Sequence, residues 1–138
     1  MDLFNTLDLV VLERSLDAAQ LRQKVLANNI ANIDTPGFKR SDVSFDSMLQ
    51  AYLGDPERPL AGRRTNERHL PIGSGDIEQL RPSVIQETST TVSSNGNNVD
   101  IDSEMTQLAQ NQIKYNALIT QLNHQFSLLR TAINEGRR

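Results

Sequence analysis

The most distinctive stretch of the chain reads LANNIANIDTPGFKR, residues 26–40, where an apolar helical pattern gains three asparagines and then stops. Pro36 and Gly37 suit the two central positions of a type II turn, the second of which needs a positive φ. Thr35, directly before the proline, is pushed out of helical torsion angles. The stretch therefore predicts that a helix ends here and that the chain turns away from it.

The three asparagines are Asn28, Asn29 and Asn32. They fall where a helix leaves its last carbonyls without partners, and their amides can pair with those carbonyls or with the backbone of a neighbouring chain. Asparagine also favours helix ends by propensity alone, which explains one such residue more readily than three.

Upstream of this turn, apolar residues predict a helix from about Asp8 to Ile33. They recur at alternating steps of three and four, with Gln23 as the one interruption. The first apolar line consists of Leu9, Leu12, Leu16, Ala19, Leu26, Ile30 and Ile33, and a second apolar line on nearly the opposite side consists of Val11, Ala18, Leu21 and Val25. Because one partner helix cannot cover both lines, we expect surfaces from other chains to cover the second.

The end of the chain repeats the pattern, with Gln112 as the interruption. Asn98 and Asp100 are candidate N-caps, Asp102 and Glu104 place negative charge on the first turn, and a glycine with two arginines, residues 136–138, ends the helix. The apolar positions are Ile101, Met105, Leu108, Tyr115, Ile119, Leu122, Phe126, Leu129 and Ile133.

These patterns predict a mainly α protein whose long N- and C-terminal helices pair as a coiled-coil-like hairpin. Two helices of an ordinary bundle are the alternative that periodicity leaves open. The residues predicted to fill the helix seam or to act in assembly are Leu16, Leu26, Ile30, Tyr115, Ile119, Leu122, Phe126 and Leu129.

The middle of the chain differs from both ends. Residues 54–99 hold four of the five prolines and five of the seven glycines, with too few apolar residues for a core of their own. We expect a loop or weakly β segment there, with a strand or hairpin within residues 83–93. The predicted organisation is therefore an N-terminal helix, turn and extension in 1–53, a variable segment in 54–99 and a C-terminal helix in 100–138.

Composition excludes several classes of function. With 14 basic and 17 acidic side chains the net charge is -3, which does not favour nucleic acid. The chain has no cysteine and two histidines, so we expect no metal and no other cofactor. Asp100, Asp102 and Glu104 could supply oxygen ligands, but they lack the glycine and spacing of a calcium loop, and capping is the preferred interpretation.

No catalytic grouping is recognisable either, so an enzyme would need a site that only the fold assembles. No apolar run approaches the roughly 20 residues of a membrane span, which predicts no direct membrane insertion. The chain opens with Met1 and an acidic residue where a cleaved secretory signal opens with basic and apolar residues, so we expect no such signal.

The stretch around the turn resembles the signature of flagellar rod, hook and hook-associated proteins, Ala-Asn-x-x-Ala-Asn-x-x-Thr-x-Gly-aromatic. Phe38 stands where tyrosine is more usual. Within that family the short chain, residues 96–102 and residues 126–130 look like a basal-body rod protein. The matching residues are Ala27, Asn28, Ala31, Asn32, Thr35, Gly37 and Phe38, and Pro36 belongs to the same turn.

The resemblance implies a structural, non-catalytic subunit of the proximal rod, the drive shaft that links the membrane ring of a bacterial flagellum to the distal rod. The implied partners are copies of itself, other proximal rod proteins, the rod-base protein that links to the ring, and the flagellar export apparatus. The implied location is the rod within the periplasm, reached by type III export without a cleaved signal peptide.

Early rod and hook subunits also carry a Phe-x-x-x-apolar motif that the export gate reads, and Phe45 with Leu49 fits it. The alternative is an ordinary amphipathic turn in which Phe45, Met48, Leu49 and Tyr52 share one face. The alternative function is a helical-hairpin adaptor or export chaperone that holds another protein's amphipathic helix.

Overall fold

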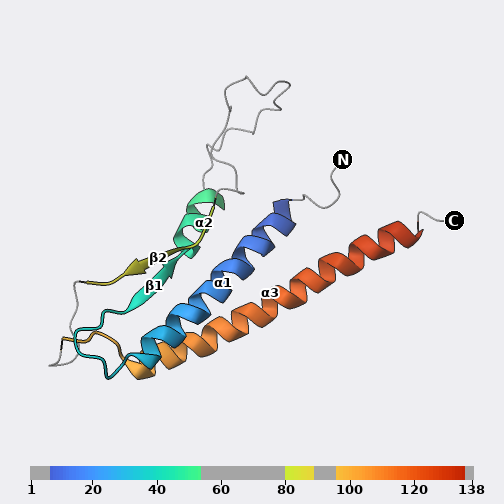
Figure 1. The fold of residues 1–138 in the computed structure, drawn as a ribbon. Helices are drawn as coiled ribbons and strands as arrows, with labels where there is room; N and C mark the ends of the chain where they lie inside the picture. Colours follow the sequence, from blue (N-terminus) through green and yellow to red (C-terminus); the bar gives the residue numbers. More distant parts are fainter. Residues whose placement is uncertain (1–6, 54–79, 89–95, 136–138) are drawn as a thin grey trace, which may run out of the picture.

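The computed structural model describes residues 7–53, 80–88 and 96–135. Its two long helices are α1, Leu7–Ala31, and α3, Ile101–Glu135, and they lie side by side (Figure 1). Asn29 bonds to Glu104 and Asn111 bonds to Ala19, so the numbering falls along one helix as it rises along the other. The predicted antiparallel helical hairpin is confirmed.

The two helices differ in length, 35 residues in α3 against 25 in α1. At about 1.5 Å per residue, the ten additional residues correspond to roughly 15 Å. Figure 1 shows the C-terminal part of α3 running on past the described end of α1.

Two short strands and a short helix lie on the other side of α1 (Figure 1). Strand β1, Ser41–Ser44, pairs antiparallel with β2, Ser83–Gln86, so that Ser41 faces Gln86. The predicted strand within 83–93 is confirmed for β2, whereas 89–93 lie outside the described residues. Strand β1 was not predicted, because four residues reading SDVS carry no clear alternation.

Most of the predicted middle segment, 54–79 and 89–95, and the predicted helix stop at 136–138 also lie outside the described residues. The β1–β2 pairing joins the N-terminal unit to the middle segment. The division into 1–53, 54–99 and 100–138 stays a prediction.

The second apolar line of α1 is covered by the same chain. Its Ala18 and Val25 form a buried cluster with Val43 of β1 and with Phe45, which precedes α2, Asp46–Leu53. Leu21, Leu49 and Leu80 pack against this cluster. The expectation that another chain must cover this line is therefore wrong, because it left out the layer that β1 and α2 provide.

The seam between the long helices follows a different line on α3 from the predicted one. The residues of α3 that are buried or half-buried at alternating steps of four and three are Glu104, Leu108, Asn111, Tyr115, Leu118, Leu122, Gln125 and Leu129. This line shares Leu108, Tyr115, Leu122 and Leu129 with the prediction. The other residues of this line each lie one position before a residue of the predicted line. Met105 and Phe126, which belong to the predicted line, are therefore about half exposed.

The start of α3 is capped as predicted. The Asp102 N–H donates to Asp100 Oδ1 at 3.0 Å, and the Glu104 N–H donates to the Asp100 carbonyl at 2.9 Å. Among the described residues, no three His, Cys, Asp or Glu side chains are grouped so that they could hold a metal ion.

Candidate functional site

The turn after α1 has the predicted geometry. Gly37 has a φ of +72°, and the Phe38 N–H donates to the Thr35 carbonyl at 3.3 Å. A Cβ placed on Gly37 would meet nothing within 4 Å, so the requirement for glycine is torsional rather than steric.

The other signature residues lie mainly at the surface. Ala27, Asn28, Ala31 and Pro36 are exposed, whereas Phe38 is half-buried. The Asn32 amide donates to the Asn28 carbonyl at 2.8 Å, which pairs one of the last carbonyls of α1. The turn and the end of the helix thus hold each other locally.

Asn29, which the signature does not contain, is fully buried with 0% of its surface exposed. Its amide nitrogen donates to the Ser41 carbonyl at 2.8 Å and to Glu104 Oε2 at 2.9 Å. Its side-chain oxygen, Oδ1, accepts from the Ser41 N–H at 3.0 Å. One side chain therefore joins α1 to both β1 and α3.

Arg40 extends this contact into the rest of the chain. Its guanidinium donates to Glu104 Oε1 and to Glu87 Oε2, each at 2.9 Å, and its backbone N–H donates to Asn98 Oδ1 at 2.6 Å. Burial acts to lower the pKa of Arg40, but the hydrogen bonds to Glu87 and Glu104 outweigh it and raise the pKa above its ordinary value. Arg40 is thus held as a cation beside the buried Glu104.

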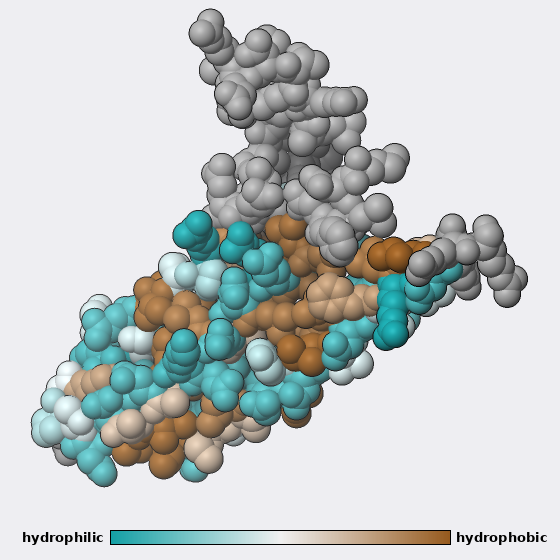
Figure 2. All heavy atoms as spheres, turned by 45° about the vertical axis from the view of Figure 1, so that its right-hand side comes forward, coloured by the Kyte–Doolittle hydropathy of each residue, from teal (hydrophilic) through white to brown (hydrophobic). Residues whose placement is uncertain are grey.

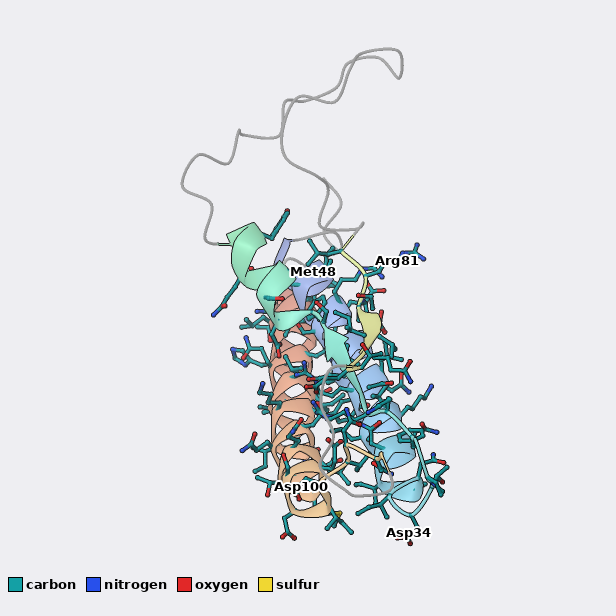
Figure 3. All side chains as sticks on the ribbon, turned by 90° about the vertical axis from the view of Figure 1, so that its left-hand side faces the viewer. Asp34, Met48, Arg81 and Asp100 are labelled. Carbon is teal, nitrogen blue, oxygen red and sulfur yellow. The ribbon has the colours of Figure 1, made fainter. Side chains whose placement is uncertain are left out.

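Asn97 completes the site by binding the turn that follows α1. Its amide donates to the carbonyls of Asn32, Ile33 and Thr35 at 3.0, 2.8 and 3.1 Å. Figure 3 shows Asp34, just past α1, and Asp100, just before α3, at the same end of the molecule. We call the residues that meet there the polar cluster: Asn29, Arg40, Glu87, Asn97, Asn98 and Glu104.

Sequence reasoning found only part of the polar cluster. Asn29 and Asn98 are predicted to lie near helix ends. Glu104 is predicted on the first turn of its helix and lies there, but its burial, at 1% exposed, is not predicted. A buried acid and a capping acid look alike in a single sequence. A signal in the sequence is Arg40 directly after the turn, a cation that needs an acidic partner if it is buried.

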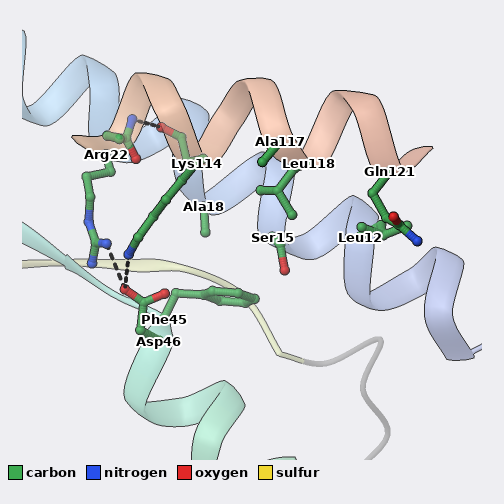
Figure 4. Close-up of a pocket in the computed structure, with 12 residues that line it drawn as sticks. Leu12, Ser15, Ala18, Arg22, Phe45, Asp46, Lys114, Ala117, Leu118 and Gln121 are labelled. Carbon is green, nitrogen blue, oxygen red and sulfur yellow. Dashed lines mark hydrogen bonds and ion pairs between the residues drawn. The ribbon is translucent and has the colours of Figure 1, made fainter. Parts of the chain in front are cut away.

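A groove lies between α1, α3 and Phe45, with a volume of about 530 Å³ (Figure 4). Leu12, Ala18 and Leu118 are among its apolar lining residues. At its charged side, Asp46 accepts from Arg22 Nη1 at 2.8 Å and lies 3.9 Å from Lys114 Nζ.

Three elements meet at that charged side. Arg22 of α1 also donates to the Val43 carbonyl of β1 at 2.7 Å, while Lys114 belongs to α3. The hydrogen bond from Arg22 lowers the pKa of Asp46, and this outweighs the burial that would raise it. These contacts hold the second layer against the hairpin.

Comparison with known proteins identifies the family. A family model described as "Flagella basal body rod protein" matches residues 9–39. The chain is 41% identical over 126 residues to "Flagellar basal body rod protein FlgB" of Bacillus subtilis (strain 168), covering 91% of this chain and 92% of that protein. The chain belongs to the FlgB family of flagellar basal body rod proteins.

FlgB proteins of other bacteria match a similar share of the chain. The FlgB of Borreliella burgdorferi is 41% identical over 82% of this chain and 85% of its own length. The FlgB of Salmonella typhimurium is 30% identical over 90% of this chain and 91% of its own length. The similarity thus runs through both long helices.

FlgB-family chains are structural components of the basal body rod and not enzymes, and they assemble with other rod components. Within the described ranges, none of the helices has the length and apolar character needed to cross a bilayer.

One face of α3 is not covered by α1. Three apolar residues on it, Met105, Phe126 and Ile133, are 52%, 51% and 62% exposed. We call the positions seven residues apart on this face the outer row: Met105, Gln112, Ile119, Phe126 and Ile133. Apolar side chains also reach the surface on the face drawn in Figure 2.

The predicted seam residues divide between two surfaces. Leu26 is buried, and Leu16, Ile30, Tyr115, Leu122 and Leu129 are half-buried. Ile119 is half-buried at the margin of the seam, and Phe126 lies outside it. The prediction that Phe126 fills the seam of the single chain is corrected, and its role in assembly is a proposal.

Proposed function

We propose that this chain is a subunit of the proximal rod, the drive shaft that joins the membrane ring of the flagellum to the distal rod. Similarity to FlgB proteins over about nine tenths of the chain supports this. The structural observation that carries the proposal is the outer row, in which Met105, Phe126 and Ile133 are more than half exposed.

The outer row has the spacing of a helix-packing surface. A seven-residue repeat keeps successive side chains on the line along which a second helix lies. In the single chain Met105, Phe126 and Ile133 of this row are exposed to water, and apolar side chains gathered on an exposed face commonly mark an interaction surface. A helix of a neighbouring subunit would bury it.

The charge of α3 supports copies of the same chain as its first partners. Residues 105–129 contain one lysine, Lys114, and no arginine, aspartate or glutamate. Charged residues are depleted at the cores of protein interfaces, and two identical uncharged rows meet without like-charge repulsion. Copies of this chain therefore pack through α3, with other proximal rod proteins and the ring-linking protein as neighbours where the run of copies ends.

The proposal places the assembled chain in the rod within the periplasm, after type III export without a cleaved signal peptide. Phe45 and Leu49 are the candidate export-gate residues. In the folded chain Phe45 is buried in the cluster with Val43, and Leu49 packs against it. The gate therefore reads Phe45 before this cluster has formed.

The assembly claim is tested with Phe126→Asp in a strain lacking the native chain. Because Phe126 is half exposed, the purified variant should keep the helix content and melting temperature of the wild type. The strain should nevertheless lose swimming, and its membranes should yield no complete rods. The matched control is Gln20→Asp, which adds the same charge at an exposed position of α1.

Wild-type swimming of the Phe126→Asp strain would show that the outer row takes no part in assembly. A different outcome is that the wild-type chain is found only in the cytosol, bound to a client protein and absent from isolated basal bodies. That result would support the adaptor function and contradict the rod function.

The export claim needs a control that weakens the same core without touching the motif. Phe45→Ala and Val43→Ala both leave a cavity in the buried cluster. They should lower the free energy of unfolding by about 3–5 kcal/mol and about 1.5 kcal/mol, respectively. Secretion into the medium by a strain that cannot complete the rod should fall at least tenfold for Phe45→Ala and stay near wild type for Val43→Ala. Equal secretion of the two variants would leave Phe45 with a packing role alone.

A further inference from the structure

The hydrogen bonds of the β1–β2 ladder define which backbone groups of each strand point outward. The Glu87 N–H donates to the Arg40 carbonyl at 2.9 Å, so these two residues form a hydrogen-bonded pair of the antiparallel ladder. Such pairs alternate with pairs whose N–H and C=O groups point away from the partner strand. The backbone groups of Ser41 and Val43 therefore point away from β2.

Side chains of α1 bind these outward groups of β1. Asn29 bonds to both the N–H and the carbonyl of Ser41, and Arg22 donates to the Val43 carbonyl at 2.7 Å. Strand β1 thus has partners on both edges, and Figure 1 shows it between β2 and α1.

The outer edge of β2 has no such cover among the described residues. Gln86 pairs with Ser41 and Val84 pairs with Val43, so the N–H and C=O groups of Gln86 and Val84 point away from β1. No described residue bonds to these groups. All four residues of β2 are exposed, including Val84 at 51% and Ile85 at 55%.

The sequence of this edge does not oppose pairing with another strand. Natural edge strands commonly carry lysine, proline or an inward charge that prevents such pairing. Strand β2 reads SVIQ and carries none of these, although Pro82 ends the edge on one side. Opposite charges flank it, with the exposed Arg81 before the strand and Glu87, which stays 38% exposed while it binds Arg40, after it.

We infer that β2 pairs with β2 of a second copy of this chain, in an antiparallel ladder centred on Ile85. Val84 of each copy then exchanges two hydrogen bonds with Gln86 of the other, and the two Ile85 side chains face each other. Arg81 lies diagonally across from Glu87 of the other copy, whereas a parallel pairing would place like charges together. The result is a four-stranded sheet in place of two marginal two-stranded ones.

This contact is separate from the outer row of α3. Because the two copies use the same surface, the pairing closes after two copies and accounts for a dimer, not for the length of a rod. The inference therefore does not rest on the proposed rod function.

Disulfide cross-linking of the purified full chain tests the pairing, because the sequence has no cysteine. Centring the ladder on Ile85 brings its two Cα atoms to about 4.5 Å, a separation that a disulfide spans. The matched control is Thr88→Cys, also exposed, whose two copies would lie roughly 20 Å apart in the same ladder. Under mild oxidation, Ile85→Cys should form the linked dimer at least tenfold faster than Thr88→Cys. Both variants also carry Phe126→Asp, so that the outer row does not bring the copies together.

Two further substitutions show what holds the pair. The Gln86 N–H faces the second copy and not β1, so Gln86→Pro removes an intermolecular donor without removing a β1–β2 bond. Added to Ile85→Cys, it should lower the cross-linking rate to that of Thr88→Cys, while hydrogen exchange of the Asp42 amide stays unchanged. Arg81→Glu, which leaves the backbone of β2 intact, should also slow the reaction and serves if the proline disturbs β1–β2 pairing.

Equal cross-linking rates for Ile85→Cys and Thr88→Cys would overturn the inference. A fast rate that neither Gln86→Pro nor Arg81→Glu lowers would also overturn it, because the copies would then meet without strand pairing. Neither result touches the rod proposal, since these variants already lack Phe126. Loss of swimming in the Phe126→Asp strain, conversely, says nothing about the edge of β2.

Discussion

Adjacent asparagines at the end of α1 have different surroundings. Asn29 is fully buried and bonded to Ser41 and Glu104, whereas Asn28 is exposed and only its backbone carbonyl is seen to accept a hydrogen bond, from the Asn32 amide. The signature that led to the family contains Asn28 and not Asn29. Asn29 is therefore the member of the pair that contributes to stability, whereas Asn28 is the one that belongs to the family signature.

This contrast predicts unequal effects of the same substitution. Asn29→Ala leaves the Ser41 amide group and a Glu104 oxygen short of a partner, so the free energy of unfolding should fall by about 2–4 kcal/mol. Asn28→Ala should change it by less than about 0.5 kcal/mol. Urea unfolding followed by circular dichroism measures both, and equal losses would show that the polar cluster does not stabilise the fold.

Gly37 gives a second prediction at this scale. A non-glycine residue in the left-handed region costs roughly 1–2 kcal/mol, and asparagine tolerates that region better than most residues. Since a Cβ there meets nothing, the loss should follow backbone preference, with Val worst, Ala intermediate and Asn smallest. Urea midpoints of the three variants test this order, and a loss that instead follows side-chain size would indicate a steric cause.

At the scale of single elements, the predicted ends of α1 are correct to within two residues, and α3 begins one residue after the predicted position 100. Apolar repeats and capping residues carry enough local information for this. The partner of the second apolar line could not be predicted, because β1 is four residues long and depends on pairing with β2 some forty residues away.

The attachment of α2 to the hairpin should depend on pH. The folded state lowers the pKa of Asp46, chiefly through its hydrogen bond from Arg22, so the ionised group stabilises the fold at neutral pH. This contribution is lost as the pH falls through the lowered pKa, because the unfolded chain binds the proton more readily. The side chain is 64% exposed, so the effect should stay below about 1 kcal/mol.

The stability difference between wild type and Asp46→Asn should therefore be largest near neutral pH and shrink toward zero in acid. Asp34→Asn, an exposed carboxylate in the turn, serves as the control. Thermal melting across the acid range measures both variants. A difference that stays constant with pH would mean that the Arg22–Asp46 pair contributes nothing through its charge.

At the scale of the whole molecule, periodicity predicted the hairpin but not the rotation of α3 within it. The apolar stripe of α3 is broad enough for either half to face α1. The half that faces it contains Glu104, which accepts from Asn29, and Asn111, which donates to the Ala19 carbonyl. Those partners lie on the opposite helix, so no local pattern reveals them. This rotation is what leaves the outer row outside the hairpin.

The most direct test of the rod proposal is a density map of isolated flagellar basal bodies at side-chain resolution. We expect this chain to form part of the proximal rod, with Met105, Phe126 and Ile133 buried against helices of neighbouring subunits. A rod without this chain, or one in which the outer row faces solvent while another surface makes the contacts, would contradict it.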